Sequence, residues 1–394
     1  MDTTSRQVLQ KILRINGRLT AARLLGLVCL LMGAGLLTAG LWPFRSPRNQ
    51  VTWIAGGSGV HFGRHATLLS SGEFKATSGQ RNAPCSIEIW FRPDLADSGT
   101  LLALYTRGRQ RQFWLHQSGT FLSLRTDPHD GIYGTASTRL YVDHVFHKGE
   151  PKFVTIVSGG ETTSVYIDGV LVRKTSDFLL SGEDLLGELI VGNSFGGDDS
   201  WSGELRGLAL YLQSLTPAQV DEHFARWSTK GRPAISEGEH PIALYLFDEH
   251  AGTVVRNQVT SQPDLYIPYH FTVVDQTFLQ PFWTEIRPTW GCLQDVLVNI
   301  GGFVPFGLVC CAYLSLAGRL KRPGVMTTLI GFAISLTIEV LQAFLPTRGS
   351  GTLDLITNTL GTGCGVWLYR FCLRRAGFLE IWSELREMTE RQES

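Results

Sequence analysis

The sequence has no net charge and few charged residues. Its 394 residues include 35 Lys and Arg and 35 Asp and Glu, so the overall charge does not point to nucleic acid as a partner. Charged residues make up 18% of the chain, whereas a soluble protein typically carries about a quarter. This deficit is typical of a chain that is partly embedded in a lipid bilayer.

Disulfide and zinc patterns are lacking as well. No spacing of Cys and His in the sequence resembles a zinc site. Of the seven cysteines, only Cys85 and Cys292 are expected outside a membrane, and a bridge between them is not the default expectation. The others lie in or beside apolar runs, where Cys behaves as a small hydrophobic residue: Cys29, Cys310, Cys311, Cys364 and Cys372.

Four long apolar runs are present, and each can cross a bilayer core of about 30 Å at about 1.5 Å per helical residue. They span residues 24–41, 293–316, 325–345 and 353–373. We therefore expect four transmembrane helices, namely an N-terminal anchor at 24–43 and a bundle of three at 290–373. A cleaved signal peptide is the alternative for the first run, but its apolar core and basic leader are longer than is typical.

Basic residues beside the apolar runs indicate the orientation. The first 23 residues contain five of them, and the short loop at 319–323 reads Arg-Leu-Lys-Arg-Pro. By the positive-inside rule, both termini (1–23 and 374–394) lie in the cytoplasm and residues 49–276 lie outside. The sequence therefore predicts a multi-pass protein of the plasma or inner membrane with a large extracytoplasmic domain.

Residues 49–276 have the pattern of an antiparallel β-sandwich. Apolar and polar residues alternate in several short runs, as at 86–91 and 153–157. Asp168-Gly169 separates two further alternating runs, which is a strong sequence signature of a hairpin. Many short strands with no helices between them predict a sandwich of antiparallel sheets.

Helices are expected to be rare in this domain. No helical period is evident between 51 and 269, and one short helix is expected at 216–220, with Thr216 as its N-cap and Pro217 as its first residue. Glycan cleavage needs two facing carboxylates, and no strand shows such a pair, because Glu88 stands alone in its run. A binding domain is therefore favoured over a catalytic one.

Several pieces of this domain resemble, in order, the laminin G-like, concanavalin A-like jelly roll. The resemblance implies a β-sandwich that binds carbohydrates or proteins, although some relatives cleave glycans. Residues 244–249 resemble the strand that usually opens such a domain, yet they follow the helix, which predicts either a rearranged first strand or an added C-terminal strand. The matching pieces are 86–93, 165–172, 189–211 and 215–220.

Two sets of loop residues are candidates for binding a ligand or Ca²⁺. Carboxylate and amide oxygens suit Ca²⁺, which takes about six to eight oxygen ligands, and a ring such as that of Trp114 or Trp201 can stack on a sugar. The alternative, in which Asp and Asn only shape turns and the Trp residues belong to the core, is favoured. No other cofactor is expected. The two sets are Asp127, His129 and Asp130, and Asn193, Asp198, Asp199 and Trp201.

Each of the last three apolar runs carries polar residues three or four positions apart, which places them on one face of a helix. By the expected orientation, all of them fall in the outer half of the bilayer. Ionisable groups there cost about 3 kcal/mol or more and usually mark a functional site, whereas helix-joining hydrogen bonds contribute only about 1 kcal/mol each. These residues are Asp295 and Asn299, Ser335, Glu339 and Gln342, and Asp354 and Asn358.

Two further features accompany this membrane polar cluster. Arg348, in the loop before the last run, is the cation expected to offset Glu339 or Asp354. Gly361 and Gly365 form a small-xxx-small face, which predicts close packing of the last helix against a neighbour.

The polar residues and their neighbours resemble the VanZ-like family of membrane proteins. The resemblance implies a link to low-level resistance to the glycopeptide teicoplanin, and it supplies no biochemical activity. The sequence departs from the family at Gly351, where a second acid is common. The matching motifs are Asp295-x-x-x-Asn299, Phe303-x-Pro305-Phe306-Gly307, Ser335-x-x-x-Glu339-x-x-Gln342, Pro346-x-Arg348 and Asp354-x-x-x-Asn358-x-x-Gly361-x-x-x-Gly365.

Three functional hypotheses follow. In the first, the β-sandwich binds an extracellular glycan or protein, and the bundle holds a polar headgroup or envelope precursor at the outer leaflet. In the second, a membrane enzyme acts on a lipid-linked substrate through Glu339 as general acid or base and Arg348 as anion stabiliser, although no Ser/His or Cys/His pair accompanies the acids. Proton-coupled transport ranks last because it needs a homo-oligomer. Membrane lipids are expected partners under every hypothesis.

Overall fold

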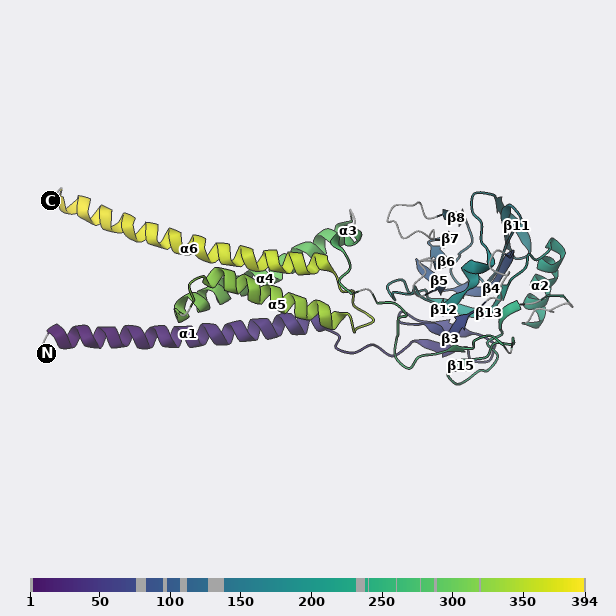
Figure 1. The fold of residues 1–394 in the computed structure, drawn as a ribbon, viewed down its shortest axis with the longest axis horizontal. Helices are drawn as coiled ribbons and strands as arrows, with labels where there is room; N and C mark the ends of the chain where they lie inside the picture. The colour runs from purple at the N-terminus through teal and green to yellow at the C-terminus, as the bar shows by residue number, and fades with distance from the viewer. Residues whose placement is uncertain are drawn as a thin grey trace. The chain divides into compact units, whose positions relative to one another are not determined.

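The computed structural model of the chain forms two compact units (Figure 1). The sandwich unit comprises residues 46–275, and the helical unit comprises 1–45 and 276–394. The described residues are 3–75, 83–94, 98–106, 112–126, 138–231, 238–239, 241–259, 261–276, 278–286, 289–318 and 320–392.

In its described residues, the sandwich unit contains two eight-stranded sheets, and every strand pair is antiparallel. The first sheet has the order β1 (Val51–Trp53), β2 (Val60–Phe62), β13 (Gly203–Tyr211), β4 (Cys85–Pro93), β9 (Lys152–Gly159), β10 (Thr162–Ile167) and β11 (Val170–Thr175), with β14 (Pro241–Tyr245) also paired to β13. The second sheet has the order β15 (Val254–Val255), β16 (Leu265–Tyr266), β3 (Leu68–Phe74), β12 (Gly187–Val191), β5 (Gly99–Tyr105), β6 (Gln112–Ser118), β7 (Phe121–Thr126) and β8 (Thr138–Val142). A single 3₁₀ turn, η1 (Gly182–Leu185), precedes β12.

Alternation along each strand places one set of side chains in a common core between the sheets. In β4, Ile87, Ile89 and Phe91 are buried there, and Phe91 stacks on Phe146 with ring centroids 5.0 Å apart. Burying each such side chain contributes roughly 1.5–3 kcal/mol. The predicted antiparallel β-sandwich is therefore confirmed.

The predicted hairpin is also confirmed. β10 and β11 pair directly across Asp168 and Gly169, whose φ angles are 51° and 81°. Two consecutive positive φ angles are what a type I′ turn requires, and an Asp-Gly pair tolerates them better than other residues do.

Residues 244–249 begin in the strand β14. β14 pairs antiparallel with Leu208–Tyr211 of β13, whereas β2 pairs with the preceding part, Gly203–Leu205. Both strands therefore lie along the same edge of β13. β14 therefore extends that edge from a point in the chain after α2, which both alternatives from the sequence allow.

The helix α2 (Pro217–Lys230) is longer than the sequence analysis predicted. Thr216 is its N-cap, as predicted, and its side chain accepts a hydrogen bond from the Gln219 backbone N–H at 3.3 Å. The statement that no helical period occurs in this segment was wrong, because Val220, His223 and Trp227 recur at helical spacing and are buried against the first sheet.

A buried charged cluster lies between α2 and β4. The imidazole of His223 lies 3.0 Å from the Glu88 carboxylate through Nδ1 and 3.1 Å from the Glu239 carboxylate through Nε2. Tyr211 donates its hydroxyl to Glu88 at 3.1 Å. Burial alone would lower the pKa of His223, but the hydrogen bonds and charges of Glu88 and Glu239 outweigh it and raise the pKa. An imidazole that faces a carboxylate at both nitrogens donates from both only when it is protonated.

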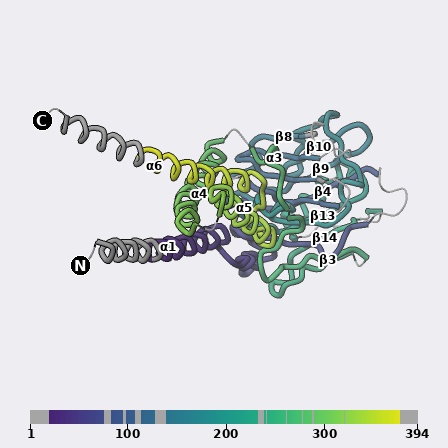
Figure 2. Tube along the Cα trace, turned by 60° about the vertical axis from the view of Figure 1, so that its left-hand side comes forward, coloured from purple at the N-terminus to yellow at the C-terminus, as the bar shows by residue number. Residues whose placement is uncertain are grey.

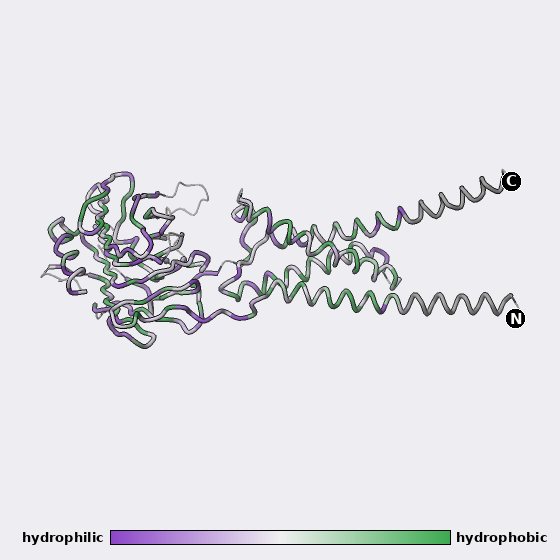
Figure 3. The backbone as a smooth tube through the Cα atoms, turned by 180° about the vertical axis from the view of Figure 1, so that it is seen from behind, coloured by the Kyte–Doolittle hydropathy of each residue, from purple (hydrophilic) through white to green (hydrophobic). Residues whose placement is uncertain are grey.

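The helical unit is built from long helices that run side by side (Figure 2). Its described helices are α1 (Thr3–Leu41), α3 (Phe282–Glu285), α4 (Trp290–Ala317), α5 (Pro323–Gln342) and α6 (Thr352–Gln392). By length and apolar composition, three segments of the described residues can cross a membrane: Thr20–Leu41, Trp290–Ala317 and Pro323–Gln342. Figure 3 shows the hydrophobic residues along these helices.

The expected fourth membrane segment at 353–373 is not among those three. The physical reason lies in its composition, because α6 begins with Asp354 and Asn358 and continues with several Thr and Gly residues, which lower its mean hydropathy. The helix still packs against α4 and α5. Its polar residues therefore lie within the bundle.

Glycine permits the close approach of α4 and α6. A Cβ on Gly365 would lie 2.2 Å from the Val304 carbonyl oxygen, and one on Gly361 would lie 2.4 Å from that of Ile300. The predicted small-residue face of the last helix therefore contacts the backbone of α4. The N-terminal helix also packs into the bundle, because Cys29 of α1 lies in a core with Phe306 and Cys310 of α4.

Candidate functional site

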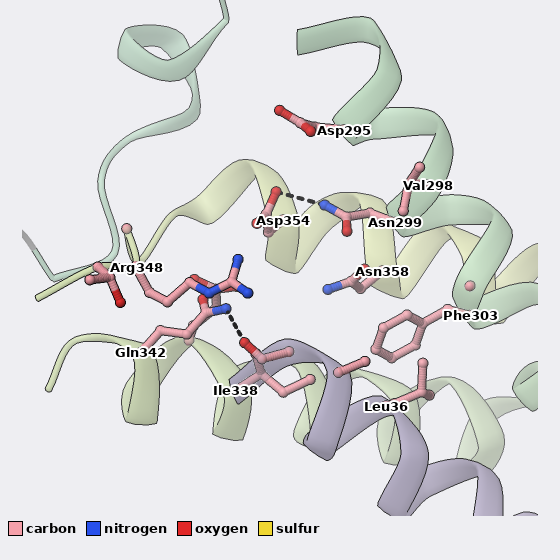
Figure 4. A pocket seen from close by; sticks show the side chains of 16 residues that line it. Leu36, Asp295, Val298, Asn299, Phe303, Ile338, Gln342, Arg348, Asp354 and Asn358 are labelled. Carbon is pink, nitrogen blue, oxygen red and sulfur yellow. Dashed lines mark hydrogen bonds between the residues drawn. The ribbon is translucent and has the colours of Figure 1, made fainter. Parts of the chain in front are cut away.

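A cavity of about 550 Å³ lies inside the helical unit (Figure 4). It is lined by α1, α4, α5, α6 and the loop between α5 and α6. The structure brings the predicted membrane polar cluster together here. Seven of its members line the cavity, namely Asp295, Asn299, Glu339, Gln342, Arg348, Asp354 and Asn358. The eighth, Ser335, accepts a hydrogen bond from the Asn358 side chain at 2.9 Å.

Hydrogen bonds across the cavity join all four long helices. Asn299 of α4 donates to the Asp354 carboxylate of α6 at 2.8 Å (Figure 4). Gln342 of α5 donates to the carbonyl oxygen of Gly40 in α1, also at 2.8 Å. The first helix was expected to act as a separate anchor, and the structure shows it as a wall of the cavity, where Leu36 and Gly40 are lining residues.

Glu339, near the end of α5, is buried, and its carboxylate lies at the N-terminus of α6. Its carboxylate accepts a hydrogen bond from the Gly351 backbone N–H at 2.7 Å. The unpaired N–H groups at a helix N-terminus carry partial positive charge, so a carboxylate is stabilised there. This position gives Glu339 a structural role in addition to any role toward a ligand.

The sequence analysis missed a further acid, Glu285 of α3. A Cβ on Gly351 would lie 2.2 Å from Glu285 Oε2, so the Glu285 carboxylate fills the space that a side chain at position 351 would need. It also accepts a hydrogen bond from the Leu353 backbone N–H at 3.4 Å. The sequence departs from the VanZ-like pattern at Gly351, and this departure was the available signal for a second acid. The sequence spacing between Glu285 and Gly351 does not indicate that the two residues meet.

Arg348 does not pair directly with Glu339 or Asp354, contrary to the expectation from the sequence. Its guanidinium donates instead to the carbonyl oxygen of Trp42, at the end of α1, with Nε 3.0 Å away. The carbonyls of the last turn of a helix lack intrahelical partners, so a cation is favoured there. Arg348 still lines the cavity and supplies its positive charge.

Three of the residues that line the cavity carry a buried side-chain oxygen without a hydrogen-bond partner. In the described part of the chain, Gln342 Oε1, Asn358 Oδ1 and Thr347 Oγ1 are buried and make no hydrogen bond, and all three residues are lining residues. Leaving a buried acceptor unpaired costs about 1–3 kcal/mol. Other lining residues are apolar, among them Phe303 and Ile338. The cavity is therefore suited to a molecule with hydroxyl or amine donors beside an apolar portion.

The loop candidates of the sandwich unit are mostly engaged within their own loop. Asn193 accepts a hydrogen bond from the Ser194 N–H at 2.8 Å and donates to Ser200 at 2.8 Å, and Asp198 accepts one from the Ser194 hydroxyl at 2.7 Å. Asp199 lies 3.1 Å from His116 Nε2. Burial would raise the pKa of Asp199, but hydrogen bonds from His116 and Thr100 outweigh it and lower the pKa.

Trp201 lies in the core between the sheets. Its side chain is buried, and its indole N–H donates to Gln117 at 2.7 Å, so it does not offer a face to a sugar. Asp127, His129 and Asp130 lie outside the described residues. Among the side chains that are described, no group of three or more His, Cys, Asp or Glu is arranged to hold a metal ion, and Ca²⁺ binding stays a prediction.

Comparison with protein families assigns both parts of the chain. The model of the VanZ/LLP1 family matches residues 242–373, and that of the concanavalin A-like lectin/glucanases superfamily matches residues 68–221. The chain joins a VanZ-like domain to a concanavalin A-like domain. The VanZ-like match begins in β14, well before the bundle, and it covers the polar cavity residues of α4, α5 and α6. With the three apolar helices, it identifies a membrane protein.

Several solved structures are similar to part of the chain. A sialidase carbohydrate-binding module of Ruminococcus gnavus, solved with α2,3-sialyllactose, shares 13% identity over 42% of this chain and 95% of its own, with a TM-score of 0.33. A pentraxin from Limulus polyphemus shares 14% identity over 57% of this chain and 94% of its own (TM-score 0.33). A putative carbohydrate-binding protein from Bacteroides ovatus shares 14% identity over 55% of this chain and 61% of its own, with a TM-score of 0.36. No curated protein matches the chain.

Proposed function

We propose that this chain is a cell-envelope membrane protein whose VanZ-like bundle binds the polar part of an envelope component. The concanavalin A-like domain would bind a saccharide or protein outside the cytoplasm. The basic residues beside the apolar segments support a cytoplasmic location for both termini. By the resemblance of the bundle, such a protein would lower sensitivity to glycopeptides such as teicoplanin.

The observation that carries this proposal is the set of buried acceptors without partners. Gln342 Oε1 and Asn358 Oδ1 face a cavity that also presents Arg348 and carboxylates. A bound molecule with hydroxyl or amine groups would satisfy those acceptors, and an anionic group would be attracted by the guanidinium. Lipid-linked saccharides of the envelope combine these groups with an apolar chain, which matches the two kinds of wall.

Replacing Asn358 or Gln342 with leucine is expected to reduce ligand retention, because leucine is similar in size and offers no acceptor. Each lost hydrogen bond should weaken binding roughly ten-fold. The full chain would be purified in mild detergent from its membranes, and co-purifying lipids would be identified by native mass spectrometry. Teicoplanin sensitivity of the producing cells is the parallel readout.

Thr359→Val is the matched control for this experiment. Thr359 lies one position after Asn358 on α6, and its hydroxyl donates to the Leu355 carbonyl of the same helix. It is not among the residues that line the cavity. We expect this variant to retain the same lipids as the unchanged chain. Equal lipid retention by all the variants would contradict binding in the cavity.

A second candidate function is catalysis through Glu339, which is favoured by the position of a buried carboxylate in a polar cavity that also holds Arg348. In that case the full chain would convert a lipid-linked glycan, and Glu339→Gln would abolish turnover while binding persists. The proposed binding function predicts no product from either protein. Mass spectrometry of the glycan over time decides between the two.

A further inference from the structure

The helix α1 changes its neighbour along its length. In its first half, a Cβ on Gly26 would lie 3.0 Å from the Tyr313 ring of α4. Near its C-terminal end, a Cβ on Gly40 would lie 2.8 Å from Ile338 of α5. The contacts of α1 therefore pass from α4 to α5. The cavity is lined by α1 only from Leu36 onward, which is the part of the helix that turns to α5.

On the side of α1 and α4, several residues that line the cavity are exposed. Val298 is 63% exposed, and Ala39 and Gly302 are exposed as well. On the side of α5 and α6, by contrast, Gln342 and Asn358 are only 7% and 5% exposed. A residue that lines a cavity and is also exposed lies at its mouth. The cavity therefore has an opening between α1 and α4.

This opening lies within the segments that can cross a membrane. Thr20–Leu41 and Trp290–Ala317 are both long and apolar enough to do so. Gly302 lies twelve positions after Trp290, which corresponds to about 18 Å along a helix axis. The apolar core of a bilayer is about 30 Å thick. In a membrane, the opening therefore faces hydrocarbon rather than water.

Small and apolar residues form the opening, whereas the acceptors lie inside. A Cβ added to Gly302 would meet nothing within 4 Å, and Ala39 and Val298 add only apolar side chains. The buried oxygens Gln342 Oε1 and Asn358 Oδ1, which make no hydrogen bond in the described part of the chain, belong to the same cavity. An apolar chain in the opening would desolvate no polar group, and a polar head further in would satisfy the acceptors.

We propose that the cavity takes its ligand from the outer leaflet through the opening between α1 and α4, and that this ligand is a lipid whose head carries hydroxyl or amine donors. The apolar chain would lie between Ala39 and Gly302, and the head would donate to Gln342 and Asn358. The inference rests on the proposal that the bundle binds an envelope component. It specifies the chemical class of that component and its route of entry.

The test is a titration of the full chain, purified in mild detergent and stripped of lipid, followed by native mass spectrometry. Phosphatidylglycerol has hydroxyl donors and acyl chains, glycerophosphoglycerol has the same head without the chains, and phosphatidylcholine has chains but no donor in its head. We expect phosphatidylglycerol to bind best. Loss of the chains and loss of the donors should each raise the Kd roughly ten-fold or more.

Gly302→Trp and Gly301→Trp form a matched pair of variants for this titration. Both glycines are exposed, and a Cβ at either would meet nothing within 4 Å, but of the two only Gly302 lines the cavity. We expect Gly302→Trp to fill the opening and to raise the Kd for phosphatidylglycerol roughly ten-fold or more. Gly301→Trp should leave it unchanged. Thermal unfolding of both variants checks that each is folded.

Each contrary outcome has a separate meaning. Equal binding of phosphatidylglycerol and glycerophosphoglycerol, or equal effects of the two tryptophan variants, would overturn entry from the lipid and leave binding in the cavity intact. Equal binding of phosphatidylcholine and phosphatidylglycerol would overturn the role of the donors.

Two further outcomes concern other occupants. A dimer that is lost only in Gly302→Trp, with no lipid bound, would assign the opening to a second copy of the chain and overturn the inference. Failure of every probe, together with the absence of any co-purifying lipid, would overturn both the inference and the proposed binding function of the bundle.

Discussion

Gly365→Ala is expected to destabilise the helical unit by about 3 kcal/mol or more, toward the upper end of what overpacking costs. The added Cβ would lie 2.2 Å from the Val304 carbonyl oxygen and 2.6 Å from the Leu308 nitrogen. Both are backbone atoms of α4, so no side chain can rotate to make room. The two helices would have to separate, and the cavity between them would lose its shape.

Gly363→Ala is the matched control. Gly363 lies on the same helix, and a Cβ there meets nothing within 4 Å. In a helix interior alanine is more favourable than glycine by about 1 kcal/mol, so this variant should be as stable as the unchanged chain or slightly more so. The two substitutions are chemically identical and should change stability in opposite directions.

Thermal unfolding of the full chain in detergent measures the difference. Cys310 and Cys311 are buried in the bundle, so their labelling by a thiol-reactive fluorophore reports its opening. Gly365→Ala should lower the midpoint markedly, and Gly361→Ala should do so as well, because its Cβ would lie 2.4 Å from the Ile300 carbonyl. Identical midpoints for Gly363→Ala and Gly365→Ala would contradict the contact between α4 and α6.

His223→Leu is expected to destabilise the sandwich unit by about 3–5 kcal/mol, because it removes the imidazolium that lies between two buried carboxylates. Glu88 would keep only the Tyr211 hydroxyl, and Glu239 would lose its contact at 3.1 Å. Urea denaturation of the full chain in detergent measures the loss of stability. Hydrogen exchange of the backbone amides in β4 and α2 then reports whether this part of the sandwich unit opens.

The same cluster predicts a pH dependence with a definite sign. The pKa of His223 is raised in the folded state above its ordinary value of 6.5. Its contribution to stability is therefore fully present below pH 6.5 and is lost as the pH rises through the raised value. The unchanged chain should lose stability over that interval, and His223→Leu should not show this loss.

Glu222→Ala is the control on the same helix. The ion pair of Glu222 with Arg226 is exposed, with an oxygen–nitrogen distance of 2.9 Å, and such pairs contribute only about 0–1 kcal/mol. Equal effects of His223→Leu and Glu222→Ala would mean that the buried cluster is hydrated and open.

Much of the fold was predictable because local patterns and global structure agree. The alternation in β4, the Asp168-Gly169 turn and the Thr216 cap are each decided by a few neighbouring residues. The polar residues of the bundle could be placed on one side of each helix by spacing, and their meeting in one cavity followed from three helices of similar span.

What the sequence did not predict depends on contacts between distant segments. Nothing in the apolar composition of α1 shows that Gly40 meets Gln342, and no spacing links Glu285 to Gly351. The period of α2 was hidden because its buried positions include His223, a polar residue that the sheet accommodates through Glu88. Arg348 was assigned to a carboxylate by charge alone, whereas helix-end carbonyls compete for the same guanidinium.

The bond between Gln342 and Gly40 joins positions 302 residues apart. During synthesis, Gly40 is made first, and the ribosome must then make the whole sandwich unit before Gln342 exists. The cavity therefore cannot form until the segments before and after the sandwich unit have both been made and have packed together.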